Sequence, residues 1–322
     1  MPGHARRTIG PALGGLLPGI VAAGVLATLR LSLDEGSFRL FVTQFLSLFI
    51  EAAPFLLMGS IVSGFLEMYL RPETLLRFVP SGRLGQVLAG SLAGMILPVC
   101  ECGIVPVARR LLRKGLPPTM AIALLLAAPA LNPIVLFSTF KAFGLGSMLL
   151  WRAGGTLLVA SAVALLVGPA WASAPAAAGP DAHRHSRSVH AALRHASDDF
   201  LGTAGYLVLG AALASLLRTV VPPEALLPVA GNPVLSVLAL QMLAFVLSLC
   251  STVDAFIALG FAGTFTGGSI LSFLVFGPML DVKSILLLLG NFPRRPVLQM
   301  AISAALLSFL LGVALNLLPF LR

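Results

Sequence analysis

The chain contains long apolar runs with almost no charged residues, and these runs limit the folds that it can adopt. About 20 consecutive apolar residues form a helix that crosses the hydrocarbon core of a bilayer. The 322-residue chain has several runs of about this length or longer. They cover residues 9–29, 40–66, 115–140, 153–180, 200–217, 225–280 and 296–321. We therefore predict an all-α polytopic protein that crosses the cell (inner) membrane several times.

The composition excludes most soluble classes of protein. Hydrophobic residues make up 58% of the chain and charged residues 10%, whereas about 25% of a soluble domain is charged. A soluble enzyme, a disordered chain and a nucleic-acid binder are thus excluded. The net charge of +9 comes from Lys and Arg in short loops between apolar runs, a pattern that orients membrane helices. The expected partners are the lipid bilayer and a small solute, while a homo-oligomer and a soluble partner stay open.

One polar stretch, 171–198, divides the chain. It holds four of the five histidines and is rich in Ala, Pro and polar residues, which is typical of a linker. We predict an N-terminal helix and loop at 1–37, a first bundle at 38–170, a cytoplasmic linker at 171–198 and a second bundle at 199–322. Histidines can bind metal ions, but we interpret this segment as a solvated basic connector and expect no resident metal or cofactor.

The two sides of the linker resemble each other at an offset of about 150 residues. Four matches lie within one residue of this offset, and they include unusual positions of each half. They are Gly59 with Gly210, Pro72-Glu73 with Pro223-Glu224, Cys100 with Cys250, and Pro129 with Pro278. Asn132 then falls on Asp281. Duplicated helical bundles are the architecture of secondary transporters, so we predict two pseudo-symmetric repeats.

Basic residues indicate how the repeats are oriented. Arginines at 71–83 and a basic cluster at 109–114 flank the short apolar run 84–108, and both clusters favour the cytoplasm. They can share that side if the run enters the membrane and returns as a hairpin. Each half then has three full crossings, which makes the second repeat inverted. A full crossing at 84–108 is the alternative.

The predicted hairpin tips carry side chains that are rare at membrane depth. The first tip contains Cys100, Glu101 and Cys102, and the second contains Cys250, Ser251 and Asp254. Thiolates favour soft ions, and an ionisable residue within a membrane is usually functional. We predict that the two tips meet and bind a soft ion or trivalent arsenic. Buried cysteines that act only as small hydrophobes, and a redox pair at Cys100 and Cys102, are the alternatives.

The helix after each tip contains a proline near its middle. Pro129 and Asn132 interrupt the first of these helices, and Pro278 and Asp281 interrupt the second. Proline removes a backbone hydrogen bond and kinks a helix, and matched broken helices in two halves indicate a transport site. We place Pro129 and Asn132 in the substrate site. Further charged residues within spans are candidates for proton coupling or for ion pairs: Glu51, Asp254, Asp281 and Lys283.

Several of these elements together resemble the ArsP/YraQ-type predicted permease family, from about residue 40 to near the C-terminus. The resemblance implies a cytoplasmic-membrane permease; some members export trivalent organoarsenicals, and others are linked to metal-ion efflux. The motifs are Glu51-x-x-Pro54-Phe55, Cys100-x-Cys102-Gly103, Ala128-Pro129-x-x-Asn132-Pro133, Ser248-x-Cys250-Ser251-x-x-Asp254 and Gly277-Pro278-Met279-x-Asp281-x-Lys283.

These observations favour an efflux permease that works by alternating access between its halves, with protons as the natural coupling ion. The chain has no Walker A motif and no hydrolase motif of the H-E-x-x-H or G-x-S-x-G type, so an enzyme is not expected. Two other hypotheses stay open: a membrane thiol redox protein that uses Cys100 and Cys102, and a membrane subunit of a multi-component permease.

Overall fold

The fold is known from a computed structural model, which describes residues 35–69, 75, 77, 79–96, 99–172, 189–220 and 223–317. This part of the chain is helical, with one isolated bridge between Ala262 and Phe265 and no β-strand. The all-α prediction is thus confirmed for the described residues. The predicted helix at 9–29 and the linker residues 173–188 lie outside them.

Six helical stretches of the described chain are long and apolar enough to cross a membrane, which confirms the multi-pass prediction. Each contains at least 24 residues, and a helix of about 20 residues already spans the hydrocarbon core. The six stretches are Glu35–Leu66, Pro118–Phe143, Ser147–Trp171, Ala196–Thr219, Gly267–Asn291 and Arg294–Leu317.

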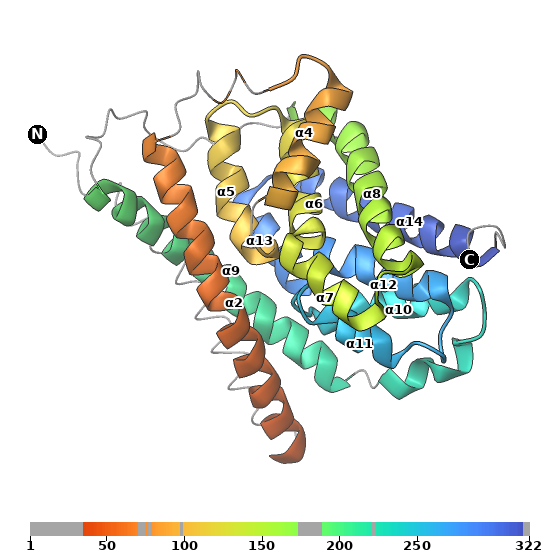
Figure 1. Cartoon of the computed structure of the whole chain (residues 1–322). Helices are drawn as coiled ribbons and strands as arrows, with labels where there is room; N and C mark the ends of the chain where they lie inside the picture. Colours follow the sequence, from red (N-terminus) through yellow and green to blue (C-terminus); the bar gives the residue numbers. More distant parts are fainter. Residues whose placement is uncertain are drawn as a thin grey trace, which may run out of the picture.

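The same order of elements occurs on both sides of the linker (Figure 1). Each half has a long helix, two short helices, a pair of helices separated by one or two residues, and a long closing helix. In the first half these are α2 (Glu35–Tyr69), α4 (Arg83–Ile96), α5 (Glu101–Arg113), α6 (Pro118–Leu131), α7 (Pro133–Phe143) and α8 (Ser147–Ala172). In the second they are α9 (Val189–Val220), α10 (Leu235–Leu247), α11 (Asp254–Gly260), α12 (Gly267–Met279), α13 (Val282–Asn291) and α14 (Arg294–Leu317), with the 3-10 helix η1 (Pro223–Val229) before α10. The inverted relation of the two halves stays a prediction.

The helices enter the predicted linker from both sides. Helix α8 continues to Ala172, and α9 begins at Val189, ten residues before the predicted start of the second bundle. The segment 189–198 contains three Ala, one Leu and one Arg, which favour helix, so α9 continues beyond its apolar part. The polar composition of 171–198 therefore did not predict where α8 ends and α9 begins.

The short helices α4 and α5 follow a path that enters the bundle and returns. They have 14 and 13 residues, which correspond to about 20 Å at 1.5 Å per residue and fall short of the ~30 Å hydrocarbon core. In Figure 1, α4 runs from the upper end of the molecule to its middle, and α5 runs back to the upper end. Helices α10 and α11 lie in the lower part of the same view. The two tips therefore reach the interior from different directions.

Glycines let the helices around these tips approach closely. A Cβ atom on Gly59 of α2 would overlap the backbone of Gly103 in α5. At the position that the repeat pairs with it, a Cβ atom on Gly210 of α9 would overlap the backbone of Lys283 in α13. Small residues at such contacts are typical of helix packing in membranes. The two matched glycines thus set the distance of α5 and α13 from the long helices.

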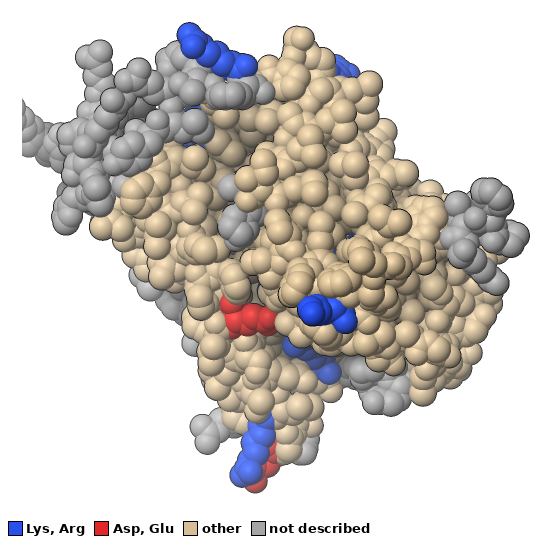
Figure 2. All heavy atoms as spheres, in the orientation of Figure 1, with Lys and Arg blue, Asp and Glu red and all other residues tan. Residues whose placement is uncertain are grey.

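The outer surface is suited to lipid. Leu, Ile and Phe side chains are exposed along α2, α4, α8 and α14, and Figure 2 shows a face on which charged residues occupy only a few small patches. Hydrocarbon can cover such apolar side chains, and the backbone groups in the interior of a helix are hydrogen-bonded within it, so these helices can face lipid.

Candidate functional site

A small cavity lies where the two hairpin tips meet α2 and α13. Its volume is about 10 Å³, which is room for about one water molecule. The cavity contains residues from both halves of the chain, and six of them were predicted as site residues. It is lined by Leu48, Glu51, Ala52, Phe55, Cys100, Glu101, Cys102, Cys250 and Lys283. Residues of the two tips therefore lie together around one cavity.

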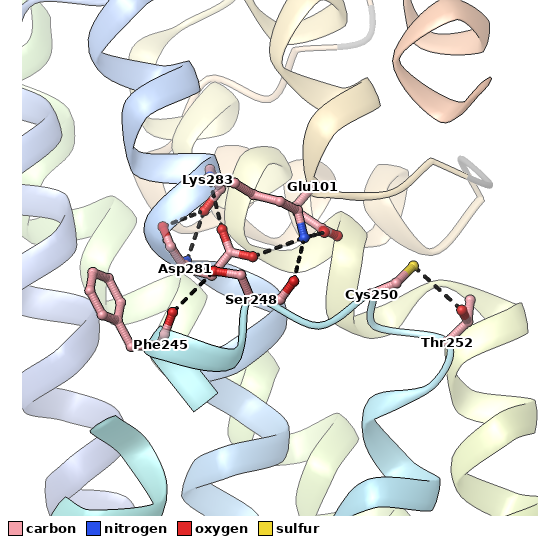
Figure 3. A network of polar contacts seen from close by, with 8 residues as sticks. Glu101, Phe245, Ser248, Cys250, Thr252, Asp281 and Lys283 are labelled. Atoms are coloured by element: carbon pink, nitrogen blue, oxygen red, sulfur yellow. Dashed lines mark hydrogen bonds and ion pairs between the residues drawn. The ribbon is translucent and has the colours of Figure 1, made fainter. Parts of the chain in front are cut away.

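Lys283 is the centre of a buried polar network beside this cavity (Figure 3). Its Nζ lies 2.9 Å from Oε1 of Glu101 and 3.0 Å from Oδ2 of Asp281, and it donates a hydrogen bond of 2.9 Å to the backbone carbonyl of Ser248. The side chains of Lys283, Glu101 and Asp281 are 3%, 5% and 1% exposed. One ammonium group therefore links the first tip, the second tip and the start of α13.

The break between α12 and α13 places Asp281 and Lys283 in this network. Helix α12 ends at Met279 and α13 begins at Val282, so the chain is extended at Asp281. The Asp281 carboxylate caps α13 by accepting a hydrogen bond of 2.6 Å from the backbone N–H of Ser284, whose hydroxyl accepts one of 2.8 Å from the N–H of Asp281. This capping box holds α13 with Lys283 in its first turn.

All three cysteines are buried and free. Cys100 is the residue before α5, and Cys102 lies in the first turn of that helix. Cys250 lies in the second tip, where its Sγ accepts a hydrogen bond of 3.4 Å from the Thr252 hydroxyl (Figure 3). Among the described residues, no group of three or more His, Cys, Asp or Glu side chains is close enough to hold a metal ion. The thiols thus share a cavity but do not form a closed coordination site.

Asp254 lies in a second, separate ion pair that the sequence did not indicate. Arg152 of α8 donates two hydrogen bonds to the Asp254 carboxylate, of 2.9 and 2.6 Å, and a third of 2.8 Å to the hydroxyl of Thr139 in α7. The Arg152 side chain is 0% exposed. The sequence did not indicate Arg152, because the predicted apolar run begins at residue 153, directly after it. Arg152 could have been recognised as a charged residue within the longer apolar stretch 147–171.

Three further predicted residues lie outside the cavity lining. Asn132 lies between α6 and α7 and caps α7, since its Oδ1 accepts a hydrogen bond of 2.9 Å from the backbone N–H of Ile134. Pro129 is a buried residue within the last turn of α6. Ser251 is 1% exposed and follows Cys250 in the second tip. Pro129 and Asn132 thus lie at the break between α6 and α7, and Ser251 lies in the second tip. Contact of these three residues with a substrate stays a prediction.

Polar contacts also hold the outer part of α5 against the second half. Arg110 pairs with Asp199 of α9 at 2.6 Å, and the same carboxylate accepts a hydrogen bond of 2.9 Å from Ser63 of α2. Arg109 donates a hydrogen bond of 3.1 Å to Asn291 at the end of α13. The basic cluster that indicated topology therefore also fixes the first hairpin.

The chain is similar to known membrane proteins over most of its length. Residues 37–317 match the ArsP_1 family, which is described as a predicted permease. UPF0718 protein YcgR of Bacillus subtilis is 42% identical over 269 residues, which cover 81% of this chain and 92% of that protein. A Streptococcus mutans protein named "Putative two-component membrane permease complex subunit" is 37% identical over 272 residues, covering 82% and 90%. No solved structure matches the chain.

Proposed function

The chain belongs to the ArsP_1 predicted permease family, and from this premise we propose that it exports a small thiophilic solute across the cell membrane. The observation that carries the proposal is the cavity lined by Cys100, Cys102 and Cys250 at the meeting point of both halves. Soft thiolate ligands favour soft ions. A trivalent arsenical or a soft metal ion is the solute that fits this chemistry best.

Transport in this proposal requires the cavity to open. A volume of about 10 Å³ does not admit an organoarsenical, so the present geometry corresponds to a closed state between two open ones. Cys100 and Cys102 belong to the first tip and Cys250 to the second, so separation of the tips exposes the thiols. Their return would enclose the solute between the halves, which is alternating access at a repeat interface. The carboxylates and Lys283 beside the cavity are the candidates for proton coupling.

A second candidate function is that of the membrane subunit of a two-component permease. The name of the Streptococcus mutans relative supports this function. In that case the chain would hold the solute path, and a separate protein would be required for transport. Purified chain reconstituted alone into liposomes distinguishes the two, because only a complete permease moves solute without a partner.

The experiment that tests the proposal uses three single variants: Cys100→Ser, Cys102→Ser and Cys250→Ser. Each should abolish uptake of phenylarsine oxide into everted vesicles, because one missing sulfur spoils the ligand set. Ser308→Ala, at a buried position on α14 away from the cavity, is the matched control and should leave uptake unchanged. Membrane abundance is checked by immunoblot.

The pattern of loss separates the hypotheses. Failure of all three cysteine variants supports the thiol site. Joint failure of Cys100→Ser and Cys102→Ser with a normal Cys250→Ser favours the thiol redox protein instead. Normal uptake in all three variants would show that the solute does not bind to the thiols.

A further inference from the structure

The charged groups around the cavity do not balance. Three carboxylates face the cavity or its lysine: Glu51 of α2, Glu101 of α5 and Asp281 before α13. Two cations face these carboxylates: Lys283, and Arg218 of α9, which interacts electrostatically with Glu51 and Asp281. With all five groups ionised, the cluster carries one excess negative charge. An excess charge in a buried site is costly, so a further cation is expected there.

The other titratable groups near the cavity do not supply this cation. The lining thiols of Cys100, Cys102 and Cys250 are neutral or negative, so they cannot offset a carboxylate. Asp254, which is close enough to interact electrostatically with Glu101, has its own partner in Arg152. The imbalance therefore belongs to the carboxylates around Lys283.

Of the two carboxylates that pair with Lys283, Glu101 accepts fewer hydrogen bonds than Asp281. The Asp281 carboxylate accepts a backbone hydrogen bond, caps the positive end of α13 and pairs with Lys283. For Glu101, Oε1 contacts Lys283, whereas Oε2 is buried and has no hydrogen-bond partner. Since Glu101 also lines the cavity, its second oxygen is the vacant acceptor beside a space of the size of one water molecule.

We propose that Glu101 is the site at which the proton coupled to transport binds, and that Lys283 is the residue that positions it. This inference rests on the proposed transport function. A proton fits better than a metal cation, because hard cations such as Ca²⁺ and Mg²⁺ take about six oxygen ligands. In the cavity lining only Glu51 and Glu101 carry oxygen-bearing side chains.

The proton changes how the first tip is held. A hydronium ion in the cavity transfers its proton to Oε2 of Glu101 and leaves a water molecule, and the excess charge of the cluster falls from −1 to zero. Lys283 stays protonated and keeps Asp281 and the Ser248 carbonyl as partners. Its ion pair with Glu101 becomes a weaker contact between a cation and a neutral carboxylic acid. The start of α5, which carries Cys100 and Cys102, is then held less strongly against α13.

Infrared difference spectroscopy of the purified protein in liposomes, without solute, tests this assignment. The wild type should show the carbonyl band of a buried carboxylic acid that grows as the pH is lowered. Glu101→Gln should lack this band, while Glu51→Gln, Asp281→Asn and the exposed control Glu35→Gln should retain it. A band that persists in Glu101→Gln, or that only another variant removes, overturns the proposal.

A conservative variant covers the case in which Glu101→Gln does not fold. Glu101→Asp keeps the charge and the pairing with Lys283 but shortens the side chain, so it should shift the pH midpoint of the same band. An unchanged midpoint overturns the assignment.

Uptake of phenylarsine oxide separates this inference from the proposed function. Uptake that continues unchanged after the pH gradient is collapsed overturns the coupling and leaves export standing. No uptake at any pH, with the Glu101 band present, overturns export and leaves the proton site standing.

Discussion

At the scale of single residues, the two buried ion clusters differ in their charge balance. Arg152 and Asp254 form a neutral pair in which Arg152 donates two hydrogen bonds to the carboxylate, and one of the same arginine nitrogens also donates to the Thr139 hydroxyl. The Lys283 cluster leaves Oε2 of Glu101 without a partner. A neutral pair stabilises one arrangement, whereas a cluster with an excess negative charge and an unpaired carboxylate oxygen can exchange a proton. We therefore propose that Asp254 stabilises the fold and that Glu101 binds the proton.

This assignment predicts that Arg152→Met destabilises the protein by about 3–5 kcal/mol, because it leaves a buried carboxylate without a counter-charge. The double variant Arg152→Met/Asp254→Leu should recover much of that loss, since neither charge then remains. The free energy of unfolding in mixed micelles measures both. The control is Arg39→Met, which removes an exposed pair with Glu35 and should cost less than about 1 kcal/mol. Equal effects of Arg152→Met and Arg39→Met would contradict the structural role.

The sequence predicted part of the site at this scale. The three cysteines, Glu101 and Lys283 could be identified because charge and sulfur are rare within apolar runs. The family resemblance carried by these motifs is confirmed. The partners of each charge could not be identified, since Lys283 joins Glu101 across 182 positions and Arg152 joins Asp254 across 102. Such pairs depend on how the hairpins pack, which no local pattern encodes.

At the scale of elements, the glycine contacts decide where the first tip and α13 lie. Gly59 touches the backbone of α5, and Gly210 touches the backbone of α13. A side chain at either position meets backbone atoms, which cannot move aside by changing rotamer. These contacts explain why the glycines occur at matched positions of the two halves, where sequence analysis could use them only as markers of the repeat.

Gly59→Val and Gly210→Val should therefore each destabilise the protein by at least about 1–3 kcal/mol, the usual cost of overpacking. Gly154→Val is the matched control, because a Cβ atom there meets nothing within 4 Å. The midpoint of thermal unfolding, followed by size-exclusion chromatography of detergent-solubilised protein, reports the difference. If Gly59→Val unfolds at the same temperature as Gly154→Val, the close contact of α2 with α5 does not exist in the membrane.

Helix boundaries were predicted less well than helix existence. The apolar runs located all six long stretches, because burial in lipid requires an uninterrupted apolar surface. They did not reveal that α9 begins at Val189, since the residues outside the bilayer follow helix propensity and not hydropathy. The run 225–280 carries one charged residue, Asp254, so hydropathy gave no helix boundaries within it. The structure divides it into α10, α11 and α12, and the predicted second tip lies between α10 and α11.

At the scale of the whole molecule, each pair of short helices contacts a helix of the opposite half. Helix α5 contacts α13, and α11 contacts α7. Charges reinforce both contacts, through Glu101 with Lys283 for the first hairpin and through Asp254 with Arg152 for the second. A movement of one half relative to the other must therefore displace a hairpin tip. This arrangement couples the cavity between the tips to any rocking of the two bundles.

The last prediction tests whether the two halves are inverted with respect to each other in the membrane. In Figure 1, α4 and α5 extend to the upper end of the molecule, whereas α10 and α11 lie in its lower part. The basic residues near Arg83 and Arg113 favour the cytoplasm. Gly82→Cys and Arg113→Cys should thus react with a membrane-impermeant maleimide only after permeabilisation, whereas Gly231→Cys and Gly260→Cys should react in intact cells. All four positions lie in exposed turns or at exposed helix ends, and the three native cysteines are buried.

Reaction of Gly82→Cys and Arg113→Cys from opposite sides would show that α4 and α5 cross the membrane completely. Reaction of all four from one side would show that the halves are parallel, and the two tips could then not enter the bilayer from opposite faces.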